Sequence, residues 1–303
     1  MTGIASLPFL ARPALDEVHL WQGDLTDLGD LVTLECLSAA ENQRLQGIRH
    51  AASARRFRLA RSGLRVVLGG YLGIPPAAVE IALRDRGKPF VPDSPLQFNI
   101  SHAGDRVWIV LAWDRAVGVD LEQERPLEVL ALARRFFHAS EADYLSTLDE
   151  SSRRTAFFRF WAVKEAYLKA TGEGLTGLEG AVLSDWDPPA LLRIPGWIAL
   201  GVPAPPGWAG AVAVAGSVPQ LIGDEVATRS LNSLVSTAPN VSRFSGVSSM
   251  TRILGILHFP VYTSGHWNLP TYSESLLQGY NFCCSTGLSS DWQNRISGHN
   301  TPI

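Results

Sequence analysis

The chain has 303 residues, 46% of them apolar, and a formal net charge of −3. This composition is typical of a globular protein, and the small net charge argues against a nucleic-acid or membrane-surface binder. Three cysteines without zinc-site spacing exclude a disulfide scaffold and a structural zinc site, which favours a reducing compartment, the cytoplasm. Since no signal-peptide pattern or long uninterrupted apolar run occurs, we expect neither a leader nor a transmembrane helix.

The first 115 residues predict strands and helices in alternation. A strand at 18–21 is followed by a helix over 38–69, which starts with Ser38 as N-cap and Glu41 as its capping-box partner. Arginines are frequent in the second part of this helix, beside an apolar face. Short apolar runs predict further strands at 79–84, 96–100 and 107–113.

The next hundred residues continue in the same mixed manner. Alternation predicts a strand at 117–122, and helical periodicity predicts helices at 127–137, 140–148 and 153–171. Two late strands are predicted at 197–200 and 210–215. Adjacent strands with separate helices indicate an α+β fold rather than a parallel doubly wound sheet.

The composition of the chain changes near residue 217. The range 1–216 contains 47 charged residues, whereas 217–303 contains 8, no lysine and 15 serines. We therefore expect 217–303 not to belong to the same folding unit. We interpret it as a poorly ordered extension, or as an artefactual, non-native sequence from a shifted reading frame or from cloning. The alternative is a small β-rich domain.

Two carboxylates lie at the end of the predicted strand 117–122. Asp120 and Glu122 are two residues apart, so both side chains project from the same face of a strand. Like charges at this distance repel unless a cation lies between them, and Mg²⁺ is the usual hard cation with oxygen ligands. The alternative is a strand whose polar face is simply solvated.

A second charged pair lies on the helix predicted at 153–171. Glu165 and Lys169 are four residues apart and share one helix face. They could form an ordinary surface salt bridge of small value. The rest of this helix is rich in Phe, Trp, Ala, Tyr and Leu, however, and a charged pair on a largely buried helix needs a reason.

Two further segments could bind an anion. Ser101 and His102 end a strand just before Gly104, where backbone and side-chain donors can hold an anion. Lys88, one of only three lysines, lies in a basic turn near the arginine-rich helix. Together they could form a phosphate-binding face. The alternatives are a structural hydrogen bond for His102 and plain surface for Lys88.

Read in chain order, the segments GKPFVP, FNISHAG, VGVDLE and FFRFWAVKEAYLKATGEGL resemble the 4′-phosphopantetheinyl transferases of the Sfp type. The resemblance runs from about residue 15 to 216. It implies a pseudo-dimer of two similar α+β halves, with coenzyme A across their junction. The halves would be 1–115 and 116–216, the second one carrying the metal and catalytic residues, although no internal sequence repeat is evident. The range 217–303 lies beyond the usual end of the family.

The resemblance also implies roles for individual residues. Asp120, Glu122 and Glu165 match the positions that hold Mg²⁺ against the pyrophosphate of coenzyme A. Glu165 also matches the general base, and Lys169 matches the lysine that contacts the pyrophosphate and stabilises the departing phosphate. Lys164 is expected to help without taking part in the chemistry. The other coenzyme A contacts that the resemblance implies are Arg44, Arg56, Lys88, Ser101 and His102, with a loose alignment around the two arginines.

The implied activity is an Mg²⁺-dependent transfer of 4′-phosphopantetheine from coenzyme A to a serine of an acyl or peptidyl carrier protein, which releases adenosine 3′,5′-bisphosphate. This is the reaction type of a holo-[acyl-carrier-protein] synthase, and it serves nonribosomal peptide or polyketide synthases. We expect a cytoplasmic monomer that docks its carrier protein near 123–150 and binds neither nucleic acid nor membrane. The alternatives are a non-catalytic module that binds coenzyme A or a carrier protein, and an unrelated metal-dependent hydrolase.

Overall fold

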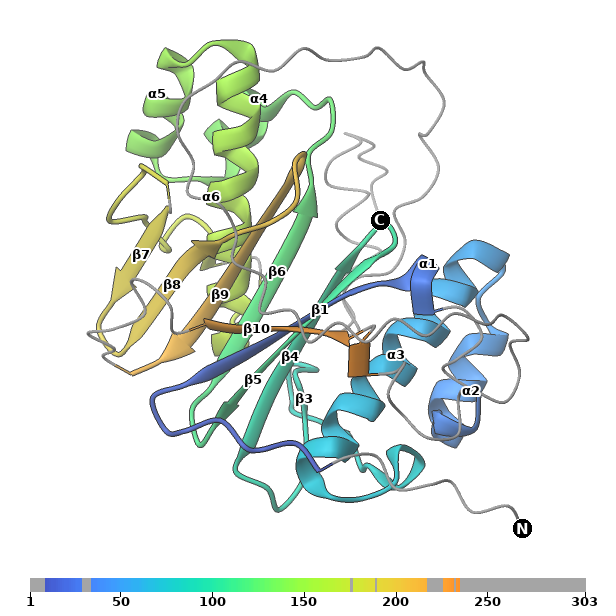
Figure 1. Cartoon of the computed structure of the whole chain (residues 1–303). Coiled ribbons are helices and arrows are strands. Elements are labelled where there is room, and N and C mark those ends of the chain that lie inside the picture. The colour runs from blue at the N-terminus through green and yellow to red at the C-terminus, as the bar shows by residue number, and fades with distance from the viewer. Residues whose placement is uncertain are drawn as a thin grey trace.

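A computed structural model of the chain describes residues 9–28, 34–174, 177–188, 190–216, 226–231 and 233–234. Helices and strands come in separate runs along these residues, which confirms the predicted α+β class (Figure 1). The elements up to residue 113 are β1 (Val18–Asp24), α1 (Leu25–Leu28), the 3₁₀ helix η1 (Leu34–Cys36), α2 (Ala39–Gln46), α3 (Ala51–Leu72), the 3₁₀ helix η2 (Pro76–Ala78), β2 (Ala82–Leu83), β3 (Pro89–Phe90), β4 (Leu96–Ala103) and β5 (Arg106–Trp113). The later elements are β6 (Val117–Gln123), α4 (Val129–Phe136), α5 (Ala139–Thr147), α6 (Glu150–Thr171), β7 (Leu191–Ile194), β8 (Trp197–Val202), β9 (Trp208–Ala215) and β10 (Val226–Ser230).

Two four-stranded sheets organise the molecule. The first has the strand order β10-β1-β5-β4, and the second has the order β6-β9-β8-β7. Each sheet has one long helix of 22 residues, α3 in the first half and α6 in the second. Apolar side chains of α3 join the core of the first sheet, whereas those of α6 pack against β6 and β9. The cores of the two halves are therefore built in the same way.

The helix that the sequence predicts over 38–69 is two helices in the structure. The predicted capping box is present, because the N–H of Glu41 donates to the Ser38 hydroxyl and the N–H of Ser38 donates to the Glu41 carboxylate. The first helix, α2, ends after eight residues at Gly47, whose N–H bonds back to the carbonyls of Arg44 and Leu45. The chain then turns before α3 begins, so the predicted continuity was wrong at this point.

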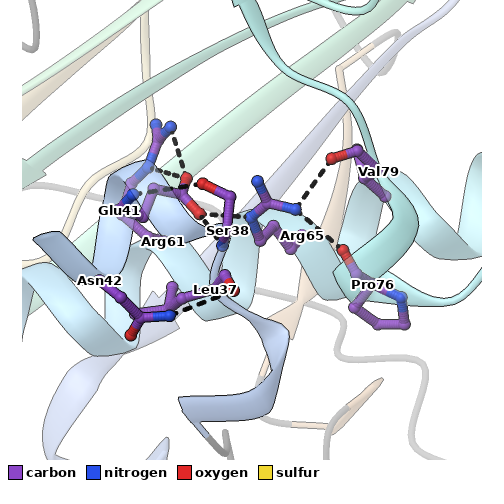
Figure 2. A network of polar contacts seen from close by, with 8 residues as sticks. All are labelled: Leu37, Ser38, Glu41, Asn42, Arg61, Arg65, Pro76 and Val79. Atoms are coloured by element: carbon purple, nitrogen blue, oxygen red, sulfur yellow. Dashed lines mark hydrogen bonds and ion pairs between the residues drawn. The ribbon is translucent and has the colours of Figure 1, made fainter.

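A buried ion network attaches α2 to α3. Glu41 accepts from Arg61 at 2.8 Å and from Arg65 at 2.5 Å, and both arginines come from α3. Arg65 also donates to the carbonyls of Pro76 and Val79 (Figure 2). These contacts satisfy a nearly buried guanidinium, as burial of a charge requires. Part of the basic character of this helix is therefore structural.

The second half contains a comparable network around α6. Lys164 is completely buried and forms an ion pair of 2.7 Å with Glu141, which is also completely buried. The ammonium further donates to the carbonyls of Leu178 and Ala181. Lys164 thereby attaches α5 and the chain after α6 to that helix, which agrees with a supporting role outside the chemistry.

The two sheets meet at the edges formed by β4 and β6. Side chains of β4 satisfy the backbone of β6 there, since Val119 donates its N–H to the Asn99 amide oxygen and Leu121 donates to the Ser101 hydroxyl. These bonds are 3.1 and 3.3 Å long. The junction is thus made by side chains of the first half on the open edge of the second sheet.

The segment after residue 216 requires a correction. β10 pairs in parallel with β1, and Leu231 and Leu234 enter the core of the first half. The predicted boundary of the folding unit at 216 is therefore too early, because the open edge of β1 and an apolar surface on α3 bind this segment. The rest of 217–303 lies outside the described residues, and so does the prediction made for it.

Within the described ranges, no helix combines the length and the apolar composition that crossing a membrane requires.

Candidate active site

The centre of the site is Asp120, a nearly buried carboxylate on β6. One of its oxygens, Oδ1, accepts from Lys169 Nζ at 2.6 Å and from the Ser101 hydroxyl at 3.1 Å. The other oxygen, Oδ2, is buried and makes no hydrogen bond within the protein. Leaving a buried carboxylate oxygen without a partner is costly, so this atom marks a place for a further donor or cation.

Ser101 holds the centre of the site together. Its hydroxyl donates to Asp120, and it accepts from Lys169 Nζ at 3.1 Å and from the N–H of Leu121 at 3.3 Å. These contacts use the one donor and the two acceptor positions that a hydroxyl offers. The side chain of Ser101 is therefore occupied by the protein itself, and its predicted contact with coenzyme A stays a prediction.

Two glutamates complete an acidic cluster with Asp120. Glu122 follows on β6 and Glu165 lies on α6, and both are partly buried. Burial, followed by the charge of Asp120, raises the pKa of Glu122 to about 7 and that of Glu165 to about 8. Lys169 opposes both shifts, and Arg125, whose Nη1 lies 3.4 Å from Glu122 Oε2, opposes that of Glu122. The structure thus brings the three predicted acidic positions together.

This cluster fits a hard divalent cation in its chemistry. Its donors are carboxylate oxygens, one of them is a buried oxygen without a hydrogen bond, and the three carboxylates repel one another. Among the described residues, however, no group of three or more His, Cys, Asp or Glu side chains is already arranged to hold a metal ion. Metal binding by Asp120, Glu122 and Glu165 therefore stays a prediction.

Positive charges surround His102, which ends β4 close to the acidic cluster. Burial, followed by Lys169, Arg56 and Arg61, lowers the pKa of His102 to about 4, so the imidazole is neutral at pH 7. Its ring is thus held in a field of nearby cations. Such a field favours an anion, which is what the predicted phosphate contact of His102 requires.

The two predicted arginines lie in the same basic region. Arg56 forms a partly exposed ion pair of 2.8 Å with Asp105. Arg44 lies 5.4 Å from the ring centre of Phe57, and burial together with the charge of Arg61 lowers the pKa of its guanidinium. Neither contact tests a role in binding coenzyme A, which stays a prediction for both.

Lys88, whose contact with coenzyme A stays a prediction, bonds to the main chain of the second half. Its ammonium donates to the carbonyl of Val117 at 3.2 Å and to that of Ala170 at 2.5 Å. Burial, followed by the charge of Arg84, lowers its pKa to about 8. Two of its three N–H donors are therefore occupied by the main chain of the second half.

Sequence reasoning missed Asn99 and Arg125. Asn99 lies in the quoted segment FNISHAG, and the signal was its position two residues before Ser101, which places both on one face of β4. Arg125 follows the two carboxylates of β6 by only a few residues, but the pairing with Glu122 depends on the path of the chain after the strand.

Comparisons with known proteins identify the family of the chain. The model of the 4′-phosphopantetheinyl transferase superfamily matches residues 116–194. The 4′-phosphopantetheinyl transferase HetI of Nostoc sp. is 39% identical over 212 residues, which cover 66% of this chain and 89% of the relative. The transferase psf-1 of Bacillus pumilus is 36% identical over 56% of this chain and 72% of the relative, and Sfp of Bacillus subtilis is 30% identical over 46% and 62%. The chain therefore belongs to the 4′-phosphopantetheinyl transferases of the Sfp type.

Proposed function

We propose that the protein transfers 4′-phosphopantetheine from coenzyme A to a serine of an acyl or peptidyl carrier protein and requires Mg²⁺. The observation that carries this proposal is the cluster of Asp120, Glu122 and Glu165, with Lys169 inside it and a cation-rich region beside it. A substrate with a pyrophosphate and a separate phosphate group needs this combination. The carboxylates would hold the cation, and the basic region would receive the phosphate.

Binding and orientation of coenzyme A are assigned to the basic region. His102 and Arg56 lie close enough for the charge of one to affect the other, and Lys169 connects this region to the acidic cluster. We propose that His102 and Arg56 receive the 3′-phosphate near the end of β4. Lys169, near the end of α6, would contact the pyrophosphate. Mg²⁺, when bound by the three carboxylates, would neutralise charge on the pyrophosphate oxygens.

Glu165 is proposed as the general base. Its carboxylate would take the proton from the serine hydroxyl, directly or through water, while the serine oxygen forms a bond to phosphorus. The bond between this phosphorus and the bridging oxygen of the pyrophosphate breaks, and adenosine 3′,5′-bisphosphate leaves. Lys169 would stabilise the charge that grows on the departing phosphate.

We also infer that the two halves form a pseudo-dimer. β1 and β6 begin 99 residues apart, and so do α3 and α6. Arg65 and Lys164 are each the fifteenth residue of their helix, and each pairs with the glutamate of a capping box, Glu41 or Glu141. These matching positions and contacts support the repeat, whereas sequence similarity between the halves is weak.

The alternative is a module of the same fold that binds coenzyme A or a carrier protein without catalysis. Such a module would not need a base, an acidic cluster and a lysine in contact. The three carboxylates, with Glu165 as the proposed base, and Lys169 lie together here. This arrangement favours the enzyme over the binding module, and it gives no reason to prefer a hydrolase.

Mass spectrometry of an apo carrier protein tests the proposal. The full-length protein, coenzyme A and MgCl₂ should add one phosphopantetheine group to the carrier, and EDTA should prevent the addition. A carrier whose acceptor serine is replaced by alanine is the matched control and should gain nothing. If several apo carrier proteins bind but none is modified, the proposed transfer is wrong and the binding module is correct.

A further inference from the structure

Lys88 connects two elements of the second half although it belongs to the first half. It lies in the turn between β2 and β3, and its ammonium bonds to the carbonyl of Val117 at the start of β6 and to that of Ala170 near the end of α6. These bonds span 29 and 82 residues of sequence. One side chain thus holds the beginning of a strand against the end of a helix.

Both carbonyls would otherwise lack a partner from regular structure. Ala170 belongs to the last turn of α6, where carbonyls have no intrahelical partner and the helix dipole favours a cation. Val117 lies on β6, the edge strand of its sheet. A partly buried ammonium that binds both groups satisfies the backbone and its own charge together.

The two elements approach each other very closely at this point. A Cβ atom added to Gly118 would lie 2.2 Å from the carbonyl oxygen of Ala166 and 2.6 Å from the nitrogen of Ala170. Only glycine therefore allows β6 to lie this close to α6. Lys88 contacts the residue before Gly118 and so acts at the closest approach of the two elements.

The elements that Lys88 joins carry the two parts of the acidic cluster. Asp120 and Glu122 follow Val117 on β6. On α6, Glu165 lies five residues before Ala170 and Lys169 lies directly before it. A shift of α6 along β6 would change every distance between the two sets. Misplacement of reacting groups by about 1 Å can lower a rate by about 100-fold.

We propose that Lys88 is a positioning residue, which fixes the end of α6 on the start of β6 and thereby sets the geometry of the acidic cluster. The inference rests on the proposed function, since the cluster is assigned to phosphopantetheine transfer. It differs from a phosphate contact, because the ammonium acts through the main chain and not on coenzyme A.

Steady-state kinetics of full-length Lys88→Met and Lys88→Arg variants test the inference. The methionine keeps the length of the side chain and removes the donors, so kcat should fall about 100-fold while the KM for coenzyme A changes little. Arginine can still donate to the carbonyls and should restore part of kcat. The exposed neighbour Arg86, changed to methionine, is the matched control and should leave both constants unchanged.

The possible results separate the alternatives. A raised KM for coenzyme A with an unchanged kcat would show a phosphate contact and overturn the inference, and so would a lower melting temperature with unchanged kinetics. If Lys88→Met does not fold, Lys88→Gln provides a second variant, because it keeps a donor on a shorter side chain and should also lower kcat. A wild-type protein that modifies no carrier would overturn the proposed function itself, and this inference with it.

Discussion

When β1 and β6 are aligned on their first residues, Trp21 and Gly23 of the first half correspond to Asp120 and Glu122 of the second. The same alignment of α3 with α6 places Val66 at the position of Glu165. The second half therefore has carboxylates at these three positions, whereas the first half has apolar residues and a glycine. The corresponding strand and helix thus carry packed apolar side chains in the first half and an acidic cluster in the second.

The core of the first half includes residues of the segment that follows the second half. Leu231 is fully buried, and Cβ atoms added to Gly23 or Gly63 would lie 3.0 Å from its Cδ2 atom. Trp21 and Val66 belong to the same core. Both halves thus have a buried ion pair on the long helix, whereas the face between strand and helix holds apolar packing in the first half and the acidic cluster in the second.

The largest expected effect is at Glu165, whose counterpart in the first half is Val66. Glu165→Gln keeps the size of the side chain but removes the base, and transfer should slow by about 100-fold to 10,000-fold without loss of the fold. Val66→Ala is the matched change in the first half and should lower stability while the activity of the folded protein stays normal. Mass spectrometry of the carrier and thermal unfolding measure the two effects. Normal turnover of Glu165→Gln would remove the assignment of the base.

The second expected effect compares the two buried ion pairs. Lys164→Met leaves Glu141 buried without its cation and should lower the free energy of unfolding by about 4 kcal/mol. Arg65→Met should cost less, because Glu41 retains Arg61 at 2.8 Å. Urea denaturation of both variants measures the difference. A larger loss in Arg65→Met would contradict the view that the first half distributes its charge over two arginines.

The third expected effect concerns the returning segment. Leu231→Ala should lower the free energy of unfolding by about 3 kcal/mol, since the side chain is fully buried in the first core. A Cβ at Gly63 would lie 3.0 Å from Leu231 Cδ2, so Gly63→Ala should be less favourable in the wild-type protein than in the Leu231→Ala background. A double-mutant cycle by urea denaturation checks this coupling. Additive effects of the two substitutions would show that the side chain of Leu231 does not pack against Gly63.

The acidic cluster and the basic residues were predictable because spacing and residue type are local information. Asp120 and Glu122 lie two apart on a strand, and Glu165 and Lys169 lie four apart on a helix, so each pair was placed correctly on one face. That the pairs meet depends on the packing of β6 against α6, which the resemblance implied and the residue spacing alone could not predict. The hydrogen bond between Lys169 and Asp120 likewise depends on this packing and could not be predicted from spacing.

The parts that were not predicted depend on contacts between distant residues. Lys88 binds a carbonyl 82 residues later in the chain, and no local pattern distinguishes this lysine from one on the surface. The strand β10 pairs with β1, 208 residues earlier in the chain, whereas the low charge of 217–303 suggested a separate tail. The break at Gly47 was missed because polar residues on both sides continue the helical pattern.

The smallest expected effect is the pH dependence of the ion network in the first half. Burial alone would raise the pKa of Glu41, but Arg61, the backbone N–H of Ser38 and Arg65 together outweigh it and lower the pKa below its ordinary value. The stability that this carboxylate contributes is therefore present above the pKa of the unfolded chain, about 4.3, and is lost as the pH falls through the lower folded value. Glu41→Gln should cost about 2 kcal/mol at pH 7, and its difference from the wild type should shrink in the acid range.

Urea denaturation of the wild type and Glu41→Gln between pH 7 and pH 3, about the range in which glutamates titrate, measures this trend. Glu150→Gln is the control, because the side chain of Glu150 is 86% exposed and its ion pair with Arg154 lies at the surface. Exposed pairs of this kind contribute little, so the control should follow the wild type throughout. A difference between Glu41→Gln and the wild type that stays constant down to pH 3 would show that the carboxylate of Glu41 contributes packing but no charge to the network.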